Sequence, residues 1–508
     1  MKKPLLAIFL FLSVFAFSQG GYEIKINIKN FPDSVAYLAK YTFGKQYIVD
    51  TCKKVVNGNM VFKGKRDLEK GMFFIASLDK DGKAVHRFDL IIDDASKMTI
   101  ASDMSDIQYN LKATGSKENQ AFFDYTRFFM DKNKSFTELA KQTKGKSQED
   151  SAKFMKQKAK EFTEDVVKYE ADFVEKSKGT FLWIWQNLRT EKEAKTYPAG
   201  LKNASDSGMY RFNYYKSHYW DGVDFKDDRI LRNQFFEPRL TKYFDQVVNQ
   251  LGPDTVAAEV VKILDQCTPG SETFNFLFVH FMVEYENPKL VGFDKVFVEL
   301  VEHYIKTGKA GKIYDESTVK KIEEKSDIVK PLLIGSKAPD LFMIDTVNAR
   351  IVNKMGFDTA HTSDGVTKLY YKNMEKLAPL YTTLSSVKAK WTLLVFWDVD
   401  CGHCQTEIPK LLESYHELRK KYDVKIFAVY TVYEFEKWRK YIIDKKLDFI
   451  NVYDPVHINN IKVKYDIFST PKVYLLNKDK VIVSKHFPAD KFSELIEGFE
   501  SEESKKTK

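Results

Sequence analysis

The sequence predicts a multidomain protein with an N-terminal antiparallel β domain, a central α-helical domain and a C-terminal α/β domain. A chain of 508 residues is too long for one hydrophobic core. The spacing of apolar residues changes twice, from alternation to helical spacing near residue 115, and to alternating strands and helices after residue 334. Hydrophobic residues make up 44% of the chain, which is enough to fill the cores of all three domains.

The first 18 residues have the layout of a secretory signal peptide. Lys2 and Lys3 precede an apolar run at 5–17, and Ser18 is a small residue at the expected cleavage position. The apolar run is shorter than the ~20 residues that span a bilayer, which disfavours a membrane anchor. We therefore expect export to the periplasm, where disulfides persist, and a mature protein that does not span the membrane.

Residues 19–115 are predicted to form the β-rich domain, because short alternating runs are separated by Asn-Gly, Asp-Gly and Pro-Asp turns. Residues 116–330 are predicted to form the α-helical domain, since apolar residues such as Phe122, Tyr125 and Phe129 recur at helical spacing. An aromatic segment at 211–225 is less regular. Further helices are expected at 240–251, 255–266, 271–286 and 293–307.

Residues 334–500 are predicted to form the α/β domain. The apolar strand WTLLVFWDV is followed by a helical stripe, the strand VKIFAVYTV, the helix FEKWRKYIIDKK, a hairpin around Lys478-Asp479 and a closing helix. This order predicts a sheet with helices on both faces. Residues 348–388 are irregular and are interpreted as an insertion or a long loop. Residues 501–508 are expected to be a disordered tail.

The charge pattern disfavours nucleic acid as a partner. The formal net charge is +9, but the lysines are interspersed with acidic residues. Such a mixture is typical of a solvated surface and differs from the concentrated basic stripe that nucleic-acid binding uses.

The motif CGHC places Cys401 and Cys404 around Gly402 and His403, directly after the predicted strand and at the start of the predicted helix. A helix N-terminus stabilises a thiolate and lowers the pKa of the thiol. Cys404, one helical turn further on, can resolve a mixed disulfide formed at Cys401. The spacing therefore predicts a redox site that needs no cofactor beyond its own Cys401–Cys404 disulfide.

Two other interpretations of CGHC are weaker. His403 could join the two cysteines as a zinc ligand, but structural zinc takes four ligands and no second pair lies at suitable spacing. A structural disulfide that closes so short a loop would restrict the unfolded chain very little. We therefore expect no metal. Cys52 and Cys267 lie in different predicted domains and are interpreted as buried thiols, with an interdomain disulfide as the alternative.

Several motifs in the last third of the chain resemble the TlpA/ResA-like class of exported thiol–disulfide oxidoreductases, which have a thioredoxin fold. They are the segment GSKAPDL, the strand LLVFW, CGHC at the strand–helix junction, Pro409 in the following helix, and Ser469-Thr470-Pro471 before the strand KVYLL. The resemblance covers residues 334–499. It implies that the bond between Thr470 and Pro471 is cis and faces the two cysteines.

The resemblance also implies a role for each site residue. Cys401 attacks a substrate disulfide, Cys404 resolves the mixed disulfide, and Glu407, in the pattern CxxCxxExP, accepts the proton of Cys404. A partly buried carboxylate near the sulfurs is expected to have a raised pKa. Thioredoxins proper have an Asp where this chain has Val395. Trp397, Thr470 and Pro471 are expected to position the substrate.

Two departures from the family pattern leave the direction of electron flow open. Asp400 replaces a frequent Trp and, with Asp398, adds negative charge that opposes thiolate formation at Cys401. His403 replaces the Pro that is typical of thioredoxin, and its cation would stabilise the thiolate and the reduced form. Asp400 and His403 therefore have opposite effects on the stability of the Cys401 thiolate.

The order of signal peptide, β domain, helical domain and C-terminal redox domain resembles large exported thioredoxin-like proteins of Bacteroidota. It implies a periplasmic enzyme that reduces disulfides of substrate proteins, with a membrane thiol-transfer protein as electron donor. One alternative is a disulfide oxidase or isomerase. Another is a binding or assembly protein with an accessory thioredoxin domain.

Overall fold

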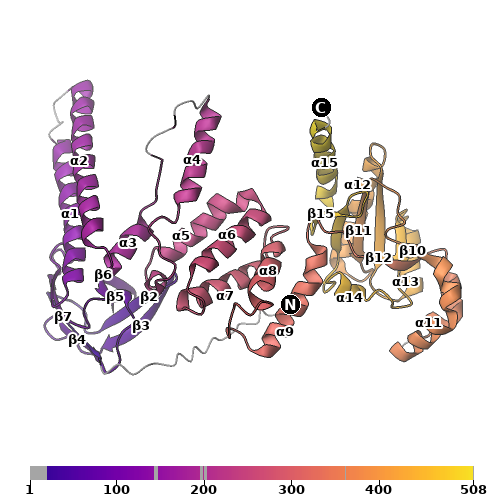
Figure 1. Cartoon of the computed structure of the whole chain (residues 1–508), viewed down its shortest axis with the longest axis horizontal. Coiled ribbons are helices and arrows are strands. Elements are labelled where there is room, and N and C mark those ends of the chain that lie inside the picture. Colours follow the sequence, from indigo (N-terminus) through magenta and orange to yellow (C-terminus); the bar gives the residue numbers. More distant parts are fainter. Residues whose placement is uncertain are drawn as a thin grey trace. The chain divides into compact units, whose positions relative to one another are not determined.

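The computed structural model of the chain describes residues 20–79, 81–141, 147–194, 198, 203–360 and 362–506, so the predicted signal peptide lies outside the described residues. The described residues divide into two compact units. The first unit extends to Gln250 and includes Gln266–Thr273, and the second comprises Leu251–Asp265 and the chain from Phe274 onward. Figure 1 shows the elements of both units along the chain.

The strands of the first unit form two sheets within the described residues, with strand orders β4-β1-β7-β8 and β3-β2-β5-β6. The bounds of these strands are β1 Tyr22–Lys29, β2 Ala36–Thr42, β3 Lys45–Cys52, β4 Asn59–Gly64, β5 Gly71–Leu78, β6 Ala84–Ile92, β7 Lys97–Asp103 and β8 Lys112–Thr114.

One pair in this β region is parallel, whereas the sequence predicted an antiparallel domain. Strand β1 pairs with β7 in parallel, and Ile26 lies opposite Ile100. Both side chains are fully or almost fully buried. The two strands are far apart in sequence, so no hairpin turn dictates their direction. Burial of their alternating apolar residues on one face fixes the register.

The helices of the first unit follow its sheets, and α1 and α2 lie side by side (Figure 1). Their bounds are α1 Lys117–Lys141, α2 Gln148–Lys176, α3 Phe181–Arg189, α4 Ala204–His218, η1 Asp228–Leu231, α5 Phe236–Lys242, η2 Tyr243–Val248 and η3 Asn249–Leu251. Helix α4 includes half of the aromatic segment that the sequence indicated as less regular. The side chain of Asn203 starts this helix by accepting a hydrogen bond from the Asp206 amide at 2.9 Å.

Several helices of the second unit precede its sheet. Their bounds are α6 Pro253–Gln266, α7 Glu272–Glu286, α8 Asp294–Leu300, η4 Val301–Ile305, α9 Glu316–Val329 and η5 Lys330–Leu332, although parts of α6 and α7 belong to the first unit. The helices predicted at 240–251, 255–266, 271–286 and 293–307 are therefore present, with ends shifted by a few residues.

The α/β sheet has the strand order β10-β9-β13-β12-β11-β14-β15. Its strands are β9 Phe342–Asp345, β10 Tyr381–Thr383, β11 Trp391–Trp397, β12 Val424–Tyr430, β13 Ile450–Tyr453, β14 Lys472–Leu476 and β15 Ile482–Lys485. Strand β11 is buried along its whole length, between parallel β12 and antiparallel β14. Such burial requires cover on both faces, which agrees with its continuous apolar sequence. The predicted hairpin of β14 and β15 is confirmed.

The two faces of this sheet are covered differently. The longer helices α12 Gly402–Leu418, α13 Phe435–Lys445 and α15 Phe492–Lys506 pack on one face, where Ile408, Trp438 and Ile496 belong to one buried cluster. The other face is covered by the short helix α14 Ile461–Lys464 and by the segments 332–341 and 384–389. The prediction of helices on both faces therefore holds, but unequally.

Two expectations for irregular chain are wrong. Residues 348–388 contain α10 Ala349–Val352, η6 Asn353–Phe357, α11 Ser363–Leu377, η7 Ala378–Leu380 and strand β10. Val366 and Leu377 of α11 are buried, which stabilises this helix. In the predicted tail, α15 continues to Lys506, and Glu500 and Glu503 both pair with Lys390, at 2.7 and 2.9 Å.

Among the described residues, no helix is both long enough and apolar enough to cross a membrane.

We predict that Leu394→Ala destabilises the α/β sheet by about 3 kcal/mol, because it removes a fully buried side chain and leaves a cavity. Native-state hydrogen exchange on the whole chain measures the opening free energies of β11 and β12. Lys425→Ala, at an exposed position of β12, is the matched control and should change them by less than about 0.5 kcal/mol. Equal protection in both variants would contradict this packing.

Candidate functional site

Cys401 and Cys404 lie where the sequence predicted them, between the end of β11 and the first turn of α12. Cys401 is the N-cap of α12, and its Sγ accepts a hydrogen bond from the Cys404 amide at 3.3 Å. Cys401 is half-buried, whereas Cys404 is only 1% exposed. The helix start therefore presents Cys401 to solvent and keeps Cys404 behind it.

The two thiols have opposite pKa shifts. Burial opposes the Cys401 thiolate, but hydrogen bonds from the Cys404 thiol, from the Thr470 side chain and from backbone amides of the first helical turn outweigh it, so the pKa of Cys401 is lowered. Burial, and then the hydrogen bond to Cys401, raises the pKa of Cys404 to about 12. The thiolate therefore forms more readily at Cys401 than at Cys404, and Cys404 stays protonated at neutral pH.

Thr470 and Pro471 lie beside Cys401, and the peptide bond between them is cis, as predicted. The backbone carbonyl of Thr470 accepts a hydrogen bond from the neutral Cys401 thiol, with an Sγ to oxygen distance of 3.1 Å. Antiparallel pairing of β14 with β11 explains this proximity, because Phe396 lies opposite Lys472 at the end of both strands. The sheet register thus brings together residues that are about 70 positions apart.

Ion pairs hold the loop that carries Thr470. Lys472 donates to the backbone carbonyl of Asp466 at 2.6 Å and to its carboxylate at 3.0 Å. Lys325 of α9 donates to the same carboxylate at 3.1 Å. Lys472 and Asp466 are largely buried, so these interactions are weakly screened by solvent. They fix both ends of the segment that faces Cys401.

The expected raised pKa of Glu407 is wrong. Its carboxylate accepts a hydrogen bond from the Ala489 amide at 2.9 Å and pairs with Lys410 at 3.0 Å. The Ala489 amide, with Lys410, lowers the pKa of Glu407 and outweighs the opposing effect of its partial burial. Sequence spacing placed this residue near the motif, but it could not reveal that the chain at Ala489 supplies a donor.

The remaining predicted residues lie around the cysteines at different depths. Gly402 and His403 are exposed in the first turn of α12. Asp400 forms an ion pair with Lys437, which compensates the negative charge expected to oppose the thiolate. Trp397 is only 1% exposed and packs against the rings of Tyr430 and Tyr441. Trp397 therefore belongs to the buried cluster that also contains Cys404, whereas the sequence suggested that it positions the substrate.

Tyr441 and the backbone amide of Asp398 are additional neighbours of Cys404. The amide of Asp398 donates to the Cys404 sulfur, and burial followed by the proximity of Cys404 raises the pKa of Tyr441. Tyr441 lies on α13. No spacing in the sequence relates α13 to CGHC, so no sequence pattern indicates that Tyr441 lies near Cys404.

The two other cysteines lie outside this site. Cys52 remains a thiol and is partly exposed, although the sequence suggested that it is buried. Cys267 is buried as expected, and burial raises its pKa to about 12. In the part of the chain that the structure describes, no group of three or more His, Cys, Asp or Glu residues is arranged to hold a metal ion.

Three family models match separate parts of the chain. Residues 22–122 match a domain of unknown function, DUF4369, and residues 189–326 match another, DUF5106. Residues 377–485, which contain the CGHC motif, match the AhpC/TSA family. No curated protein matches the chain.

Several solved structures that are similar to this chain come from Bacteroides species, and one comes from Cytophaga hutchinsonii. A domain of a possible thiol-disulfide isomerase from Cytophaga hutchinsonii is 34% identical and aligns with 35% of this chain and 99% of its own, with a TM-score of 0.27. A thioredoxin-like protein from Bacteroides caccae is 18% identical, with 60% and 97% of the two chains aligned and a TM-score of 0.32. The thioredoxin domain of a Bacteroides vulgatus thiol-disulfide oxidoreductase is 23% identical over 33% and 97%, with a TM-score of 0.25.

We predict that iodoacetamide alkylates Cys401 of the reduced chain with a pH midpoint below that of an ordinary thiol, because its thiolate is stabilised. Cys404 should stay unmodified until the pH approaches its pKa of about 12. Mass spectrometry of the digested protein measures the alkylation of Cys401 and of Cys404 at each pH. Cys52, whose thiol is partly exposed, is the internal control. Faster alkylation of Cys404 than of Cys401 at pH 7 would contradict the assignment.

Proposed function

The chain belongs to the TlpA-like thioredoxin-fold proteins and is a thiol–disulfide oxidoreductase, and from this premise we propose that it reduces disulfides of substrate proteins in the periplasm. The observation that carries the exchange chemistry is the opposite pKa shift of the two cysteines next to the Thr470 carbonyl. The reducing direction rests on the resemblance to the TlpA/ResA-like class. The proposal includes export by residues 1–18, with a membrane thiol-transfer protein as the electron donor.

The proposed reaction proceeds in two exchange steps. The Cys401 thiolate attacks one sulfur of a substrate disulfide, the substrate S–S bond breaks, and a mixed disulfide forms while the other substrate sulfur leaves as a thiolate. Cys404 then loses its proton and attacks the Cys401 sulfur. The second substrate sulfur leaves, and Cys401 and Cys404 form a disulfide. Two electrons have passed to the substrate, and the electron donor must return them.

Glu407 accepts the Cys404 proton in this proposal. Its lowered pKa keeps the carboxylate ionised and able to accept a proton, although it also makes Glu407 a weaker base than the sequence suggested. The Ala489 amide and Lys410 orient the carboxylate. We therefore expect Glu407 to make a modest contribution to the rate of the second exchange step.

A disulfide oxidase or isomerase is the second candidate, and one observation favours it. Lys437 compensates the charge of Asp400, so the negative charge that opposed the Cys401 thiolate is weakened. A more stable thiolate stabilises the reduced form and makes the couple more oxidising. The reduction potential of the full chain, measured against glutathione, separates the candidates: a value near that of thioredoxin, about −270 mV, supports the reductase.

We predict that Cys401→Ala abolishes reduction of insulin disulfides, because the attacking thiolate is lost. Cys404→Ser should trap mixed disulfides with substrate proteins, since the second step cannot occur. Cys52→Ser is the matched control and should retain full activity. Full insulin reduction by Cys401→Ala would refute catalysis, and the absence of any trapped protein would favour a binding or assembly role.

Glu407→Gln is expected to slow the second exchange step about tenfold, which is below the about 10²–10⁴-fold typical of acid–base catalysis, because the carboxylate is a weak base. Stopped-flow measurement of release from a preformed mixed disulfide isolates this step. Glu413→Gln, at an exposed position of the same helix, should leave the rate unchanged. If both variants match the unmodified chain, Glu407 is not the proton acceptor.

A further inference from the structure

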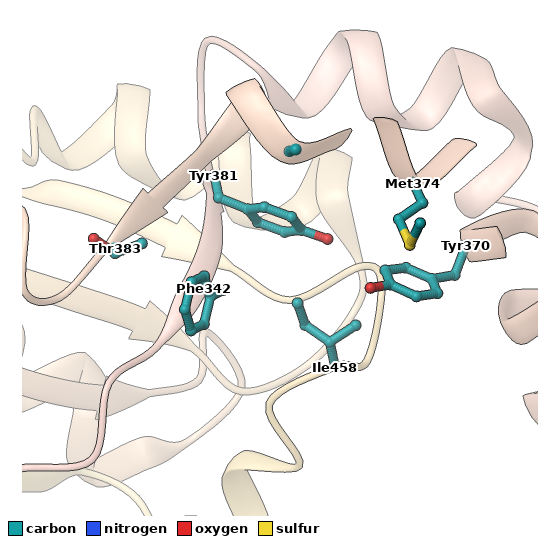
Figure 2. A pocket seen from close by; sticks show the side chains of 7 residues that line it. Phe342, Tyr370, Met374, Tyr381, Thr383 and Ile458 are labelled. Carbon is teal, nitrogen blue, oxygen red and sulfur yellow. The ribbon is translucent and has the colours of Figure 1, made fainter. Parts of the chain in front are cut away.

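A cavity of about 460 Å³ lies at the edge of the α/β sheet, and the redox mechanism does not use it. Its walls come from β9, β10, α11 and the loop after β13. Most of its lining residues lie within residues 348–388, which the sequence predicted to be irregular. Figure 2 shows its lining side chains, among them Phe342, Tyr370, Met374, Tyr381, Thr383 and Ile458. The volume falls within the range of ligand pockets.

Two features of this cavity indicate that it binds a ligand. Phe342, Met374 and Ile458 are 45%, 48% and 38% exposed, so its rim is an apolar surface left in contact with water. The hydroxyl oxygen of Tyr381 is buried and has no hydrogen-bond partner among the described residues. A buried donor without a partner is costly. A ligand with an apolar group and a hydrogen-bond acceptor would satisfy both features.

The cavity lies at the same edge of the sheet as Cys401. Strands β11, β12 and β13 are parallel, so the loops that follow them, which carry Cys401, Tyr433 and Ile458, meet at one edge. Phe342 and Thr383 lie opposite each other where β9 and β10 reach this edge. The rings of Tyr433 and His457 stack at 4.0 Å and join the loops between the cysteine and the cavity.

The strand order gives the distance between the two places. Strand β13 is two positions from β11, and β10 is four positions from it. At about 4.8 Å per strand, the cavity extends from about 10 to about 19 Å along this edge from Cys401. An extended polypeptide covers that distance with about three to six residues.

We propose that the cavity binds an apolar side chain of the substrate protein, such as Phe or Leu, three to six residues from the cysteine that Cys401 attacks. The Tyr381 hydroxyl donates a hydrogen bond to a carbonyl oxygen of the same substrate segment. This inference rests on the proposed reductase function and adds its substrate preference. We assign an extended segment as the occupant because about three to six extended residues span the distance from Cys401 to the cavity.

Single-turnover reduction of synthetic peptides by the reduced full-length chain tests the proposal. Each peptide carries one cysteine in a disulfide with glutathione and has either Phe or Ser five residues away, on the N-terminal or the C-terminal side. For one of the two sides, we expect the second-order rate constant to be about tenfold higher with Phe than with Ser. Phe342→Ala combined with Met374→Ala should reduce this ratio to about one.

Controls separate binding from folding and from chemistry. The double variant should reduce the Ser peptides and oxidised glutathione at unchanged rates, which shows that its redox site is intact. Tyr371→Ala, on α11 and 71% exposed outside the cavity, should keep the tenfold ratio. Tyr381→Phe should slow reduction of the preferred peptide about fivefold, because the hydroxyl is lost.

The possible failures are distinguishable. Equal rates for Phe and Ser peptides on both sides, or a ratio that the double variant leaves unchanged, would overturn the cavity proposal and leave the reductase proposal standing. If the reduced chain reacts with neither the peptides nor oxidised glutathione, the reductase proposal itself fails and the substrate preference fails with it.

Discussion

The antiparallel pairing of β14 with β11 is the constraint on which the chemistry of this protein depends. It runs from Thr392 opposite Leu476 to Phe396 opposite Lys472. A shift of one residue would turn every buried side chain of β14 to the other face of the sheet, so the apolar cores on both sides fix the register. The same register leaves Thr470 beside Cys401, and the ion pair of Lys472 with Asp466 holds the connecting loop.

The asymmetry between the two cysteines follows from that placement and from the start of α12. Cys401 at the N-cap is partly exposed to solvent and lies close to several hydrogen-bond donors. Cys404, one turn later, is buried in the same cluster as Trp397 and lies near Tyr441. Local geometry therefore favours the thiolate at Cys401 and the protonated thiol at Cys404, although the two side chains are chemically identical. The neighbouring charges refine this arrangement, since Lys437 pairs with Asp400 and Lys410 pairs with Glu407.

The centre of the sheet and the end formed by β9 and β10 have different roles. The central strands β11, β12 and β14 position the sulfurs and the Thr470 carbonyl, and most of their residues are buried. Strands β9 and β10, with helix α11, extend the sheet on the side of β13 and enclose an apolar cavity at the edge where Cys401 lies. The buried central strands hold the two cysteines in place. In the proposal above, the less buried edge binds the substrate, so the exchange reaction and the substrate preference depend on different parts of the sheet.

The sequence by itself determined the features that depend on local spacing. The apolar run before CGHC predicted a buried strand, and the cysteine spacing predicted a redox pair at a helix start. The resemblance to the TlpA/ResA-like class implied that the Thr470-Pro471 segment faces this pair. The tertiary structure alone decided the pKa of Glu407, the burial of Trp397, the partner of Asp400 and the cavity built by residues that the sequence left irregular. The reason is physical: periodicity reports which face of an element is apolar, but a carboxylate's pKa and a cavity's shape depend on which distant backbone amides and side chains the sheet register brings within a few ångströms.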